Sequence, residues 1–130
     1  MPLRILCVDD DRINALLMEQ LCLTIGGIEL EVAETGAQAE TLAAHCRPDL
    51  LVIDLHLPDT DGLQLLPRLR AAAGAPALPA VLCTAELASD ATPRALAAGF
   101  DECWSKPVAL GEMQAALARR LPSPRPPDAA

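Results

Sequence analysis

Residues 48–53 read Pro48-Asp49-Leu50-Leu51-Val52-Ile53, a short and nearly continuous apolar run that ends at the acidic residue Asp54. Such a run is typical of a strand inside a parallel sheet, where helices cover both faces. Residues 3–8 and 80–83 show the same pattern, and each run is likewise followed by a polar residue. The chain therefore predicts a buried parallel sheet with polar side chains where its strands end.

Helical periodicity marks the segments between and after these strands. The expected helices cover residues 11–24, 35–46, 61–73, 90–98 and 109–121. Residues 28–32 alternate apolar and acidic side chains, which predicts a half-exposed strand at a sheet edge, and residues 100–104 are the expected last strand. Pro67 falls inside the third helix and is expected to kink it or split it near its first turns.

Five strands that alternate with five helices predict an α/β fold, a doubly wound, five-stranded parallel sheet with helices on both faces and right-handed crossovers. Of the 130 residues, 52% are hydrophobic, with one Phe, one Trp and no Tyr, so the core is expected to be aliphatic. This length suits one domain, over residues 1–121. Residues 122–130 contain four prolines and are expected to form a flexible tail or linker.

The charge of the chain argues against two kinds of partner. Ten Lys and Arg residues against eighteen Asp and Glu residues give a formal net charge of −8, which repels phosphate backbones and anionic lipid head groups. Direct nucleic-acid binding is therefore not expected. The apolar runs stop far short of the roughly 20 residues that span a bilayer, so membrane insertion is not expected either. No signal peptide precedes the first strand, which predicts a cytoplasmic protein.

The cysteine pattern points to reduced thiols. Cys7, Cys22, Cys46, Cys83 and Cys103 are an odd number, are widely spaced and include no CxxC pair. Cys7 and Cys83 lie inside the apolar strand runs, where a free cysteine behaves as a small hydrophobic residue. A disulfide framework or a zinc site is therefore not expected.

Four polar positions fall where predicted strands end, and in a parallel sheet these ends share one edge. They are the acidic run Asp9-Asp10-Asp11, then Asp54, Thr84 and Lys106. Carboxylates brought together repel one another unless a cation shares the site, and hard oxygen ligands suit Mg²⁺. A nucleophilic Asp54, with Lys106 and a metal to neutralise charge, is suited to phosphoryl transfer. Asp11 is expected to serve as an acid at the start of the first helix.

At these positions the chain resembles the receiver domain of response regulators in two-component signalling. The resemblance covers residues 3 to about 121 and rests on four motifs in the family's order. They are Ile5-Leu6-Cys7-Val8-Asp9-Asp10-Asp11, the segment from Leu51 to Gly62 around Asp54, Leu82-Cys83-Thr84-Ala85, and Ser105-Lys106-Pro107. The resemblance implies a flavodoxin-like sheet with strand order 2-1-3-4-5.

The resemblance also implies a metal site. Asp10 and Asp54 would bind Mg²⁺ directly, with the backbone carbonyl of His56 as a further ligand, whereas Asp9 would act largely through water. By the same analogy, partner specificity would lie on a helix surface around Arg12, Ile13, Asn14 and Leu16.

The chemistry implied by the resemblance centres on Asp54, which would accept a phosphoryl group from a phosphohistidine. The donor would be a sensor histidine kinase or a histidine phosphotransfer protein. Lys106 would pair with the phosphoryl group and Thr84 would move to hydrogen-bond it, while His56 and Glu86 would border the attacking water and affect the lifetime of the phosphorylated form. Such a protein is a switch that phosphorylates and dephosphorylates itself rather than a conventional turnover enzyme.

One departure from the family concerns the aromatic residue found in many receivers three positions before the lysine. That position holds Cys103 here, and the aromatic residue is Trp104. Because side chains alternate along a strand, we expect the two to face opposite sides of the sheet. The usual coupling between threonine and aromatic side chain is therefore not expected to operate, and output would use other contacts on the last two helices and the last strand.

Alternatives remain open from the sequence. A Mg²⁺-dependent phosphohydrolase with an aspartyl nucleophile would share the sheet, although such enzymes typically carry an acid/base Asp two residues after the nucleophile, where this chain has His56. A pseudo-receiver that only binds proteins would lack phosphorylation. The start at Met1 favours a stand-alone receiver, whereas the proline-rich end would suit a linker within a hybrid kinase or a longer regulator. The downstream target is unknown, and a phosphorylation-dependent homodimer is compatible with this class.

Overall fold

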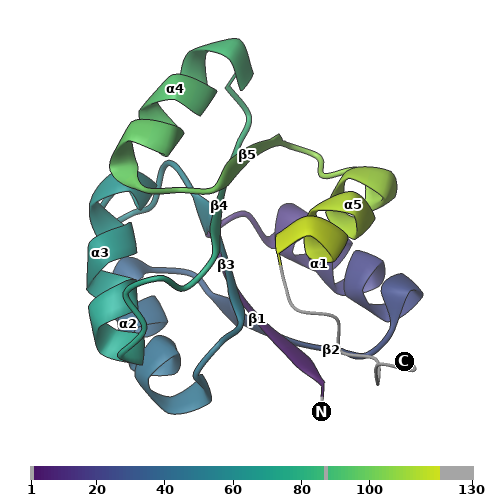
Figure 1. Cartoon of the computed structure of the whole chain (residues 1–130), viewed down its shortest axis with the longest axis horizontal. Coiled ribbons are helices and arrows are strands. Elements are labelled where there is room, and N and C mark those ends of the chain that lie inside the picture. Colours follow the sequence, from purple (N-terminus) through teal and green to yellow (C-terminus); the bar gives the residue numbers. More distant parts are fainter. Residues whose placement is uncertain (1, 87, 121–130) are drawn as a thin grey trace.

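The computed structural model describes residues 2–86 and 88–120, in which strands and helices alternate (Figure 1). The elements are β1 (Leu3–Val8), α1 (Arg12–Ile25), β2 (Ile28–Ala33), α2 (Gly36–Cys46), β3 (Leu50–Asp54), α3 (Gly62–Ala73), β4 (Ala80–Thr84), α4 (Ala88–Ala98), β5 (Glu102–Ser105) and α5 (Leu110–Arg120). The expected tail at residues 122–130 lies outside the described residues. Among those described, no helix combines the length and apolarity needed to cross a bilayer.

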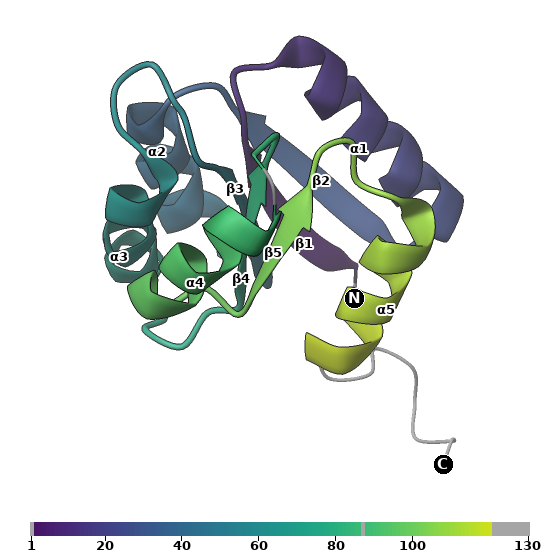
Figure 2. The same cartoon turned by 90° about the horizontal axis from the view of Figure 1, so that it is seen from above.

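The sheet has five strands in the order β2-β1-β3-β4-β5, and every pair of neighbours is parallel. Helices α2, α3 and α4 lie on one face, and α1 and α5 lie on the other (Figures 1 and 2). The predicted α/β architecture is therefore confirmed, and so is the strand order implied by the resemblance. Strand β2 forms one edge with its acidic side chains exposed, as the alternation at residues 28–32 predicts.

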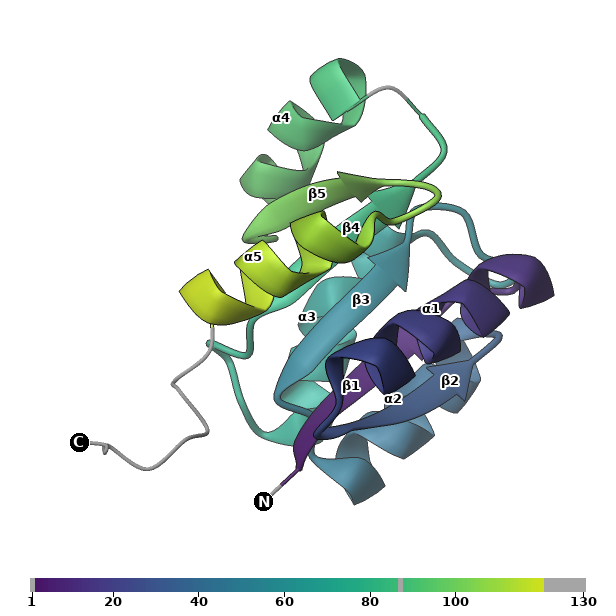
Figure 3. The same ribbon diagram turned by 90° about the vertical axis from the view of Figure 1, so that its right-hand side faces the viewer.

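Strand β3 shows how the apolar run builds the core. All five of its residues are buried, and alternate side chains enter different clusters on the two faces. Leu51 and Ile53 pack toward α2, α3 and α4, whereas Leu50 and Val52 pack toward α1 and α5. Figure 3, which looks onto α1 and α5, shows these two helices lying across the strands. Burial of both faces follows from helices on both sides.

Two of the five cysteines, Cys7 and Cys83, pack inside strands as the sequence predicts. All five are free, and Cys7, Cys22 and Cys83 are buried. Burial raises the pKa of the Cys83 thiol to about 12, which keeps it protonated at neutral pH. These thiols fill space in the core beside aliphatic side chains.

Apart from small shifts at other element ends, the structure differs from the sequence-based prediction at α3, α4 and β5. Helix α3 is continuous through Pro67, so the expected split is wrong. Pro67 is exposed, so the main-chain carbonyl that loses its helical partner lies on the side of the helix that water reaches. Helix α4 begins at Ala88 rather than residue 90. Strand β5 begins at Glu102, because the N–H of Phe100 still bonds the Ala95 carbonyl at 3.0 Å and closes the end of α4.

Candidate functional site

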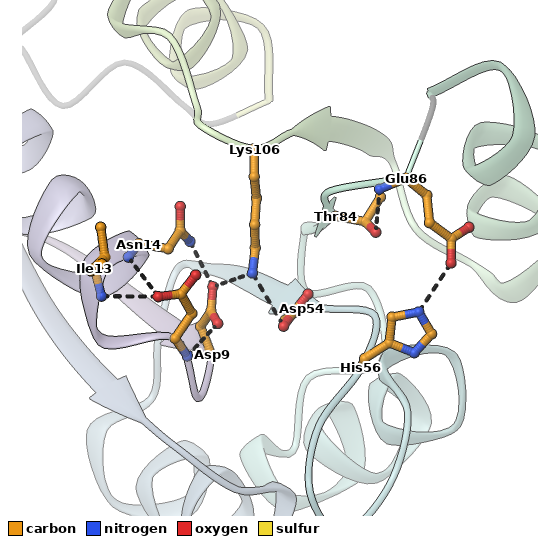
Figure 4. Close-up of polar contacts among 9 residues, drawn as sticks. Asp9, Ile13, Asn14, Asp54, His56, Thr84, Glu86 and Lys106 are labelled. Carbon is orange, nitrogen blue, oxygen red and sulfur yellow. Dashed lines mark hydrogen bonds and ion pairs between the residues drawn. The ribbon is translucent and has the colours of Figure 1, made fainter.

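The carboxyl ends of β1, β3 and β5 bring two acids and one lysine into direct contact. Lys106 Nζ lies 2.9 Å from Asp9 Oδ2 and 3.2 Å from Asp54 Oδ2, so one ammonium bridges two carboxylates (Figure 4). Asp9 is only 2% exposed and Asp54 only 7%. The backbone positions these groups: the N–H of Asp9 bonds the Ala33 carbonyl at 2.9 Å, and the N–H of Lys106 bonds the Thr84 carbonyl at 2.9 Å. The structure thus brings together Asp9, Asp54 and Lys106, three of the residues that the sequence places at strand ends.

Asp9 is the most fully bonded carboxylate of this group. Its Oδ1 accepts the N–H of Asp11 at 2.9 Å, and its Oδ2 accepts the side-chain amide of Asn14 at 2.6 Å as well as Lys106. Asn14 is buried, so its expected place on a partner-binding surface is wrong. The helix turn carries its amide inward because Asp11 caps α1, accepting the N–H groups of Ile13 and Asn14. Asp11 thus stands at the start of the helix, as expected, and in addition caps it.

Asp10 completes a cluster of acids. Asp9, Asp10 and Asp54 each offer a carboxylate oxygen, and these oxygens lie within 4.8 Å of one another. Three ionised carboxylates and one ammonium leave an excess of negative charge that a divalent cation would neutralise. Asp10 is exposed and not engaged in the lysine bridge, so it is open to a metal. The oxygen-only donor set at this edge fits Mg²⁺, which retains several waters.

The loop after β3 presents the backbone of His56 beside Asp54. His56 and Asp61 form an antiparallel bridge, whose hydrogen bonds run from the N–H of Leu57 to the Thr60 carbonyl and from the N–H of Gly62 to the Leu55 carbonyl. These bonds do not use the His56 carbonyl, which suits its expected role as a ligand. The His56 imidazole is exposed and contacts Glu86, with Nε2 3.0 Å from Oε2 (Figure 4).

Electrostatics in the site follow from burial and from the neighbouring charges. Burial raises the pKa of Asp54 to about 6, and the negative charge of Asp9 acts in the same direction, whereas Lys106 opposes both. Burial alone would lower the pKa of the Lys106 ammonium, but its hydrogen bond to Asp9 and the charge of Asp54 more than offset this, so its pKa is raised. At neutral pH Asp54 is therefore ionised and Lys106 is protonated.

Thr84 ends β4 and is buried. Its hydroxyl oxygen accepts the N–H of Glu86 at 3.2 Å, so in this state the side chain is bonded to the loop that follows its own strand (Figure 4). Glu86 is in turn paired with His56 and with Arg94 of α4. The loop after β4 thus connects the site to both the β3 loop and α4.

The close approach of Gly62 to the backbone of Asp54 was not predicted from the sequence. A Cβ at this position would lie 2.5 Å from the backbone oxygen of Asp54 and 3.1 Å from side-chain atoms of Ile53 and Leu82. Only glycine therefore allows α3 to begin against the backbone of Asp54. The sequence carries Gly62 directly after the capping residue Asp61, a position that by itself indicates a helix start and not a close approach.

Comparison with known proteins identifies the family. The model of the response regulator receiver domain family matches residues 5–118. The chain belongs to this family. The receiver is 37% identical over 131 residues to response regulator MprA of Mycobacterium sp. (strain KMS), covering 98% of this chain and 56% of that protein. It therefore spans little more than half the length of the curated relatives it matches.

Solved receiver structures share the fold. The signal receiver domain of an HD domain-containing protein from Pseudomonas fluorescens Pf-5 is 29% identical, with a TM-score of 0.80 over 92% of this chain and 87% of that one. The receiver domain of a sensor histidine kinase from Pseudomonas aeruginosa PAO1 is 28% identical, with a TM-score of 0.80 over 92% and 98% of the two chains. That structure holds a magnesium ion in its active-site cleft. The resemblance stated for the four motifs is confirmed, and the receiver is a phosphoacceptor domain of two-component signalling.

Cys103 and Trp104 of β5 face opposite sides of the sheet, as alternation along a strand predicts. Cys103 packs against the cluster beneath α2, α3 and α4, whereas Trp104 is buried in the cluster beneath α1 and α5. Trp104 Nε1 donates to Glu102 Oε1 at 3.0 Å, and Glu102 also pairs with Arg119 of α5 at 3.0 Å. The only tryptophan of the chain is thus fixed in the core away from α4.

Proposed function

We propose that this receiver accepts a phosphoryl group on Asp54 from a phosphohistidine of a sensor histidine kinase or a histidine phosphotransfer protein, in a Mg²⁺-dependent step. The observation that carries the proposal is the buried Asp54 carboxylate, which lies beside the Lys106 ammonium and within a cluster of acidic oxygens. This combination supplies a nucleophile, a fixed positive charge and a cation site at one sheet edge.

In this proposal each side chain has a defined role. An Asp54 oxygen attacks phosphorus while the bond between phosphorus and the donor imidazole nitrogen breaks, and the electron pair of that bond stays on the nitrogen of the departing histidine. Lys106 pairs with a phosphoryl oxygen, which requires its ammonium to turn from Asp54 while it keeps its bond to Asp9. Asp9, whose carboxylate is itself held by the side-chain amide of Asn14, keeps the ammonium in place. Thr84 gives up the Glu86 N–H and donates its hydroxyl proton to another phosphoryl oxygen.

Mg²⁺ would be held directly by Asp10, Asp54 and the His56 carbonyl, and by Asp9 through water. When bound, it neutralises the acidic cluster and the charge of the phosphoryl oxygens. This assignment is supported by the oxygens of Asp9, Asp10 and Asp54 within 4.8 Å of one another. It is also supported by the magnesium ion in the Pseudomonas aeruginosa receiver.

The two other function classes have less support. An aspartyl-nucleophile phosphohydrolase would need an acid/base carboxyl near the position of His56, whose imidazole instead contacts Glu86 at the exposed rim. A pseudo-receiver would not explain why two buried acids share one lysine. We further propose that the protein acts in the cytoplasm and does not bind nucleic acid directly. The target of the switch would be a downstream protein or a second phosphorylated copy of the chain.

The test is intact-mass measurement after incubation with a small-molecule phosphodonor, with and without Mg²⁺. We expect the wild-type chain to gain one phosphoryl group only with Mg²⁺, and D54A to gain none. D49A is a matched control, because Asp49 lies at the opposite end of β3 and accepts the N–H of Arg4 at 2.9 Å. It should be phosphorylated like wild type. If neither the phosphodonor nor a phosphorylated histidine protein labels the wild-type chain, the proposal is wrong and the chain is a pseudo-receiver.

A second expectation concerns the lifetime of the phosphorylated form. His56 and Glu86 contact each other at 3.0 Å beside the site, where water must enter to hydrolyse the phosphoryl group. H56N and E86A should each change the rate of dephosphorylation, measured by mass after removal of the donor. Unchanged lifetimes in both variants would exclude a role for this pair.

A further inference from the structure

Asp59 stands outside the acidic cluster, yet its carboxylate is engaged with a distant helix. Its Oδ1 accepts the N–H of Gly36 at 2.8 Å, and its Oδ2 accepts the N–H of Ala37 at 3.1 Å. Both donors belong to the first turn of α2, more than twenty residues earlier in the chain. Asp59 itself belongs to the loop between β3 and α3 that carries His56. The side chain therefore ties this loop to the start of another helix.

We infer that Asp59 is a positioning residue for the metal site: by tying the β3–α3 loop to α2, it holds the His56 carbonyl in place for the cation. This inference rests on the proposed function, because it takes the His56 carbonyl as a ligand of Mg²⁺. It assigns a role to a residue that contacts neither the phosphoryl group nor the metal.

The tie is strong for an exposed group because the donors are helix N-terminal N–H groups. These groups lack partners within the helix and carry the positive end of the helix dipole, so they favour a carboxylate. Thr35 caps the same helix by accepting the N–H of Gln38 at 3.1 Å, which leaves the first two N–H groups of α2 for Asp59. The bonds from Gly36 and Ala37 hold the pKa of Asp59 below its usual value, so the carboxylate stays ionised at neutral pH.

Packing at Gly36 independently shows that the loop sits directly on α2. A Cβ at this glycine would lie 2.8 Å from Cγ2 of Thr60 and 3.3 Å from Cδ1 of Leu65. The residue after Asp59 is thus in close contact with the helix that Asp59 caps. Hydrogen bonding and packing together fix the middle of the loop against α2.

The constraint is passed to His56 through the loop backbone. The N–H of Leu57 bonds the Thr60 carbonyl at 3.1 Å, and the N–H of Gly62 bonds the Leu55 carbonyl at 2.8 Å. His56 and Asp59 therefore lie in one closed loop, with β3 at one end and the Asp61 cap of α3 at the other. Without Asp59, the loop would be held by its two ends, by the Thr60 packing and by the exposed contact between the His56 imidazole and Glu86. The His56 carbonyl would then be less well ordered before the cation binds, which lowers affinity.

The experiment compares D59A and D59N with D49A, which also removes an exposed carboxylate that accepts a main-chain N–H but lies at the opposite end of the sheet. Mg²⁺ affinity is measured by isothermal titration calorimetry, and folding by urea unfolding. We expect D59A to raise the Kd for Mg²⁺ about tenfold, the lower end of the effect of removing support from a metal ligand. D59N, which keeps one acceptor oxygen, should give a smaller increase.

D49A should leave the Kd within about twofold of wild type even if it lowers stability, because its lost bond does not touch the loop. Equal Mg²⁺ affinity in D59A and D49A would overturn the inference. Phosphorylation is then measured across Mg²⁺ concentrations, where D59A should need more Mg²⁺ but reach the wild-type rate when saturated. Because Mg²⁺ binding is read directly, a wild-type chain that binds Mg²⁺ without being phosphorylated would refute the proposed function while still testing Asp59.

Discussion

At the amino ends of the strands, acidic side chains accept main-chain N–H groups: Asp49 takes that of Arg4 at 2.9 Å and Asp101 takes that of Ala80 at 2.9 Å. At the carboxyl ends, Asp9 and Asp54 instead share the ammonium of Lys106 and are almost fully buried. Aspartates at the amino ends of the strands therefore satisfy main-chain donors, whereas aspartates at the carboxyl ends concentrate negative charge. We call these two ends of the sheet the amino edge and the carboxyl edge.

The two edges differ in how far their charged groups are exposed to water and in whether positive and negative charges are equal in number. Arg70 at the amino edge donates twice to the Leu78 carbonyl, at 3.0 and 2.8 Å, and lies 3.9 Å from Asp101, so its positive charge is matched locally. The carboxyl edge holds more acids than bases away from water, which raises the pKa of Asp54 to about 6. An excess of buried negative charge of this kind is typical of functional sites, where a bound ligand compensates it. The polar contacts at the amino edge thus serve stability, whereas those at the carboxyl edge form the candidate site.

We expect the largest change in stability from substitutions of Lys106 at the carboxyl edge and Arg70 at the amino edge. In metal-free protein at neutral pH, K106M should lower the free energy of unfolding by about 3 kcal/mol, because it leaves two buried carboxylates without their shared partner. R70M should cost about 1 kcal/mol through the lost bonds to the Leu78 carbonyl. Urea unfolding of both variants measures the contrast. Equal losses would show that the edges do not differ electrostatically.

A gain in stability is expected from D54N in metal-free protein at neutral pH. Burial and the Asp9 charge raise the folded-state pKa of Asp54 from 3.8 to about 6, so above pH 6 the folded protein bears the full cost of an ionised carboxylate. Well below pH 3.8 the carboxyl is protonated in both states and the cost disappears. The difference in unfolding free energy between D54N and wild type should therefore grow as the pH rises from about 3 to about 7, reaching about 3 kcal/mol.

Urea unfolding at a series of pH values in EDTA gives this difference directly. D49N is the control at the other edge, where the carboxylate is exposed and bonded to the N–H of Arg4, so the substitution should not stabilise. A D54N variant that is no more stable than wild type at pH 7 would contradict the view that the carboxyl edge is charged at a cost.

The smallest contrast concerns two glycines required for different reasons. G62A at the carboxyl edge should cost about 1–2 kcal/mol, because its Cβ would lie 2.5 Å from the Asp54 carbonyl oxygen. G74A at the amino edge should cost about 1 kcal/mol, because φ is +66° although nothing lies within 4 Å. Thermal unfolding and Mg²⁺ calorimetry separate the two. G62A should also weaken Mg²⁺ binding, whereas G74A should not, and a G74A variant with impaired binding would break the comparison.

Much of this receiver follows from local patterns. Apolar runs such as residues 50–53 indicate strands, and helical spacing indicates the segments between them, because burial by neighbouring layers imposes a period that one sequence displays. Since parallel strands share their carboxyl edge, the order of the chain is enough to group the polar residues that follow those runs. The opposite directions of Cys103 and Trp104 follow equally from alternation along a strand.

The tertiary structure alone decided which groups complete the site. Asn14 lies at a helix start and carries no sign that its amide will reach Asp9, and Asp59 carries no sign that it will cap α2. The sequence likewise does not indicate that Gly62 will contact the backbone of Asp54. These contacts depend on the distance and orientation between elements far apart in the chain, which packing determines. Periodicity and strand ends are local properties, so the sequence determined the layers and the edge, whereas the partners of each carboxylate were decided by three-dimensional packing.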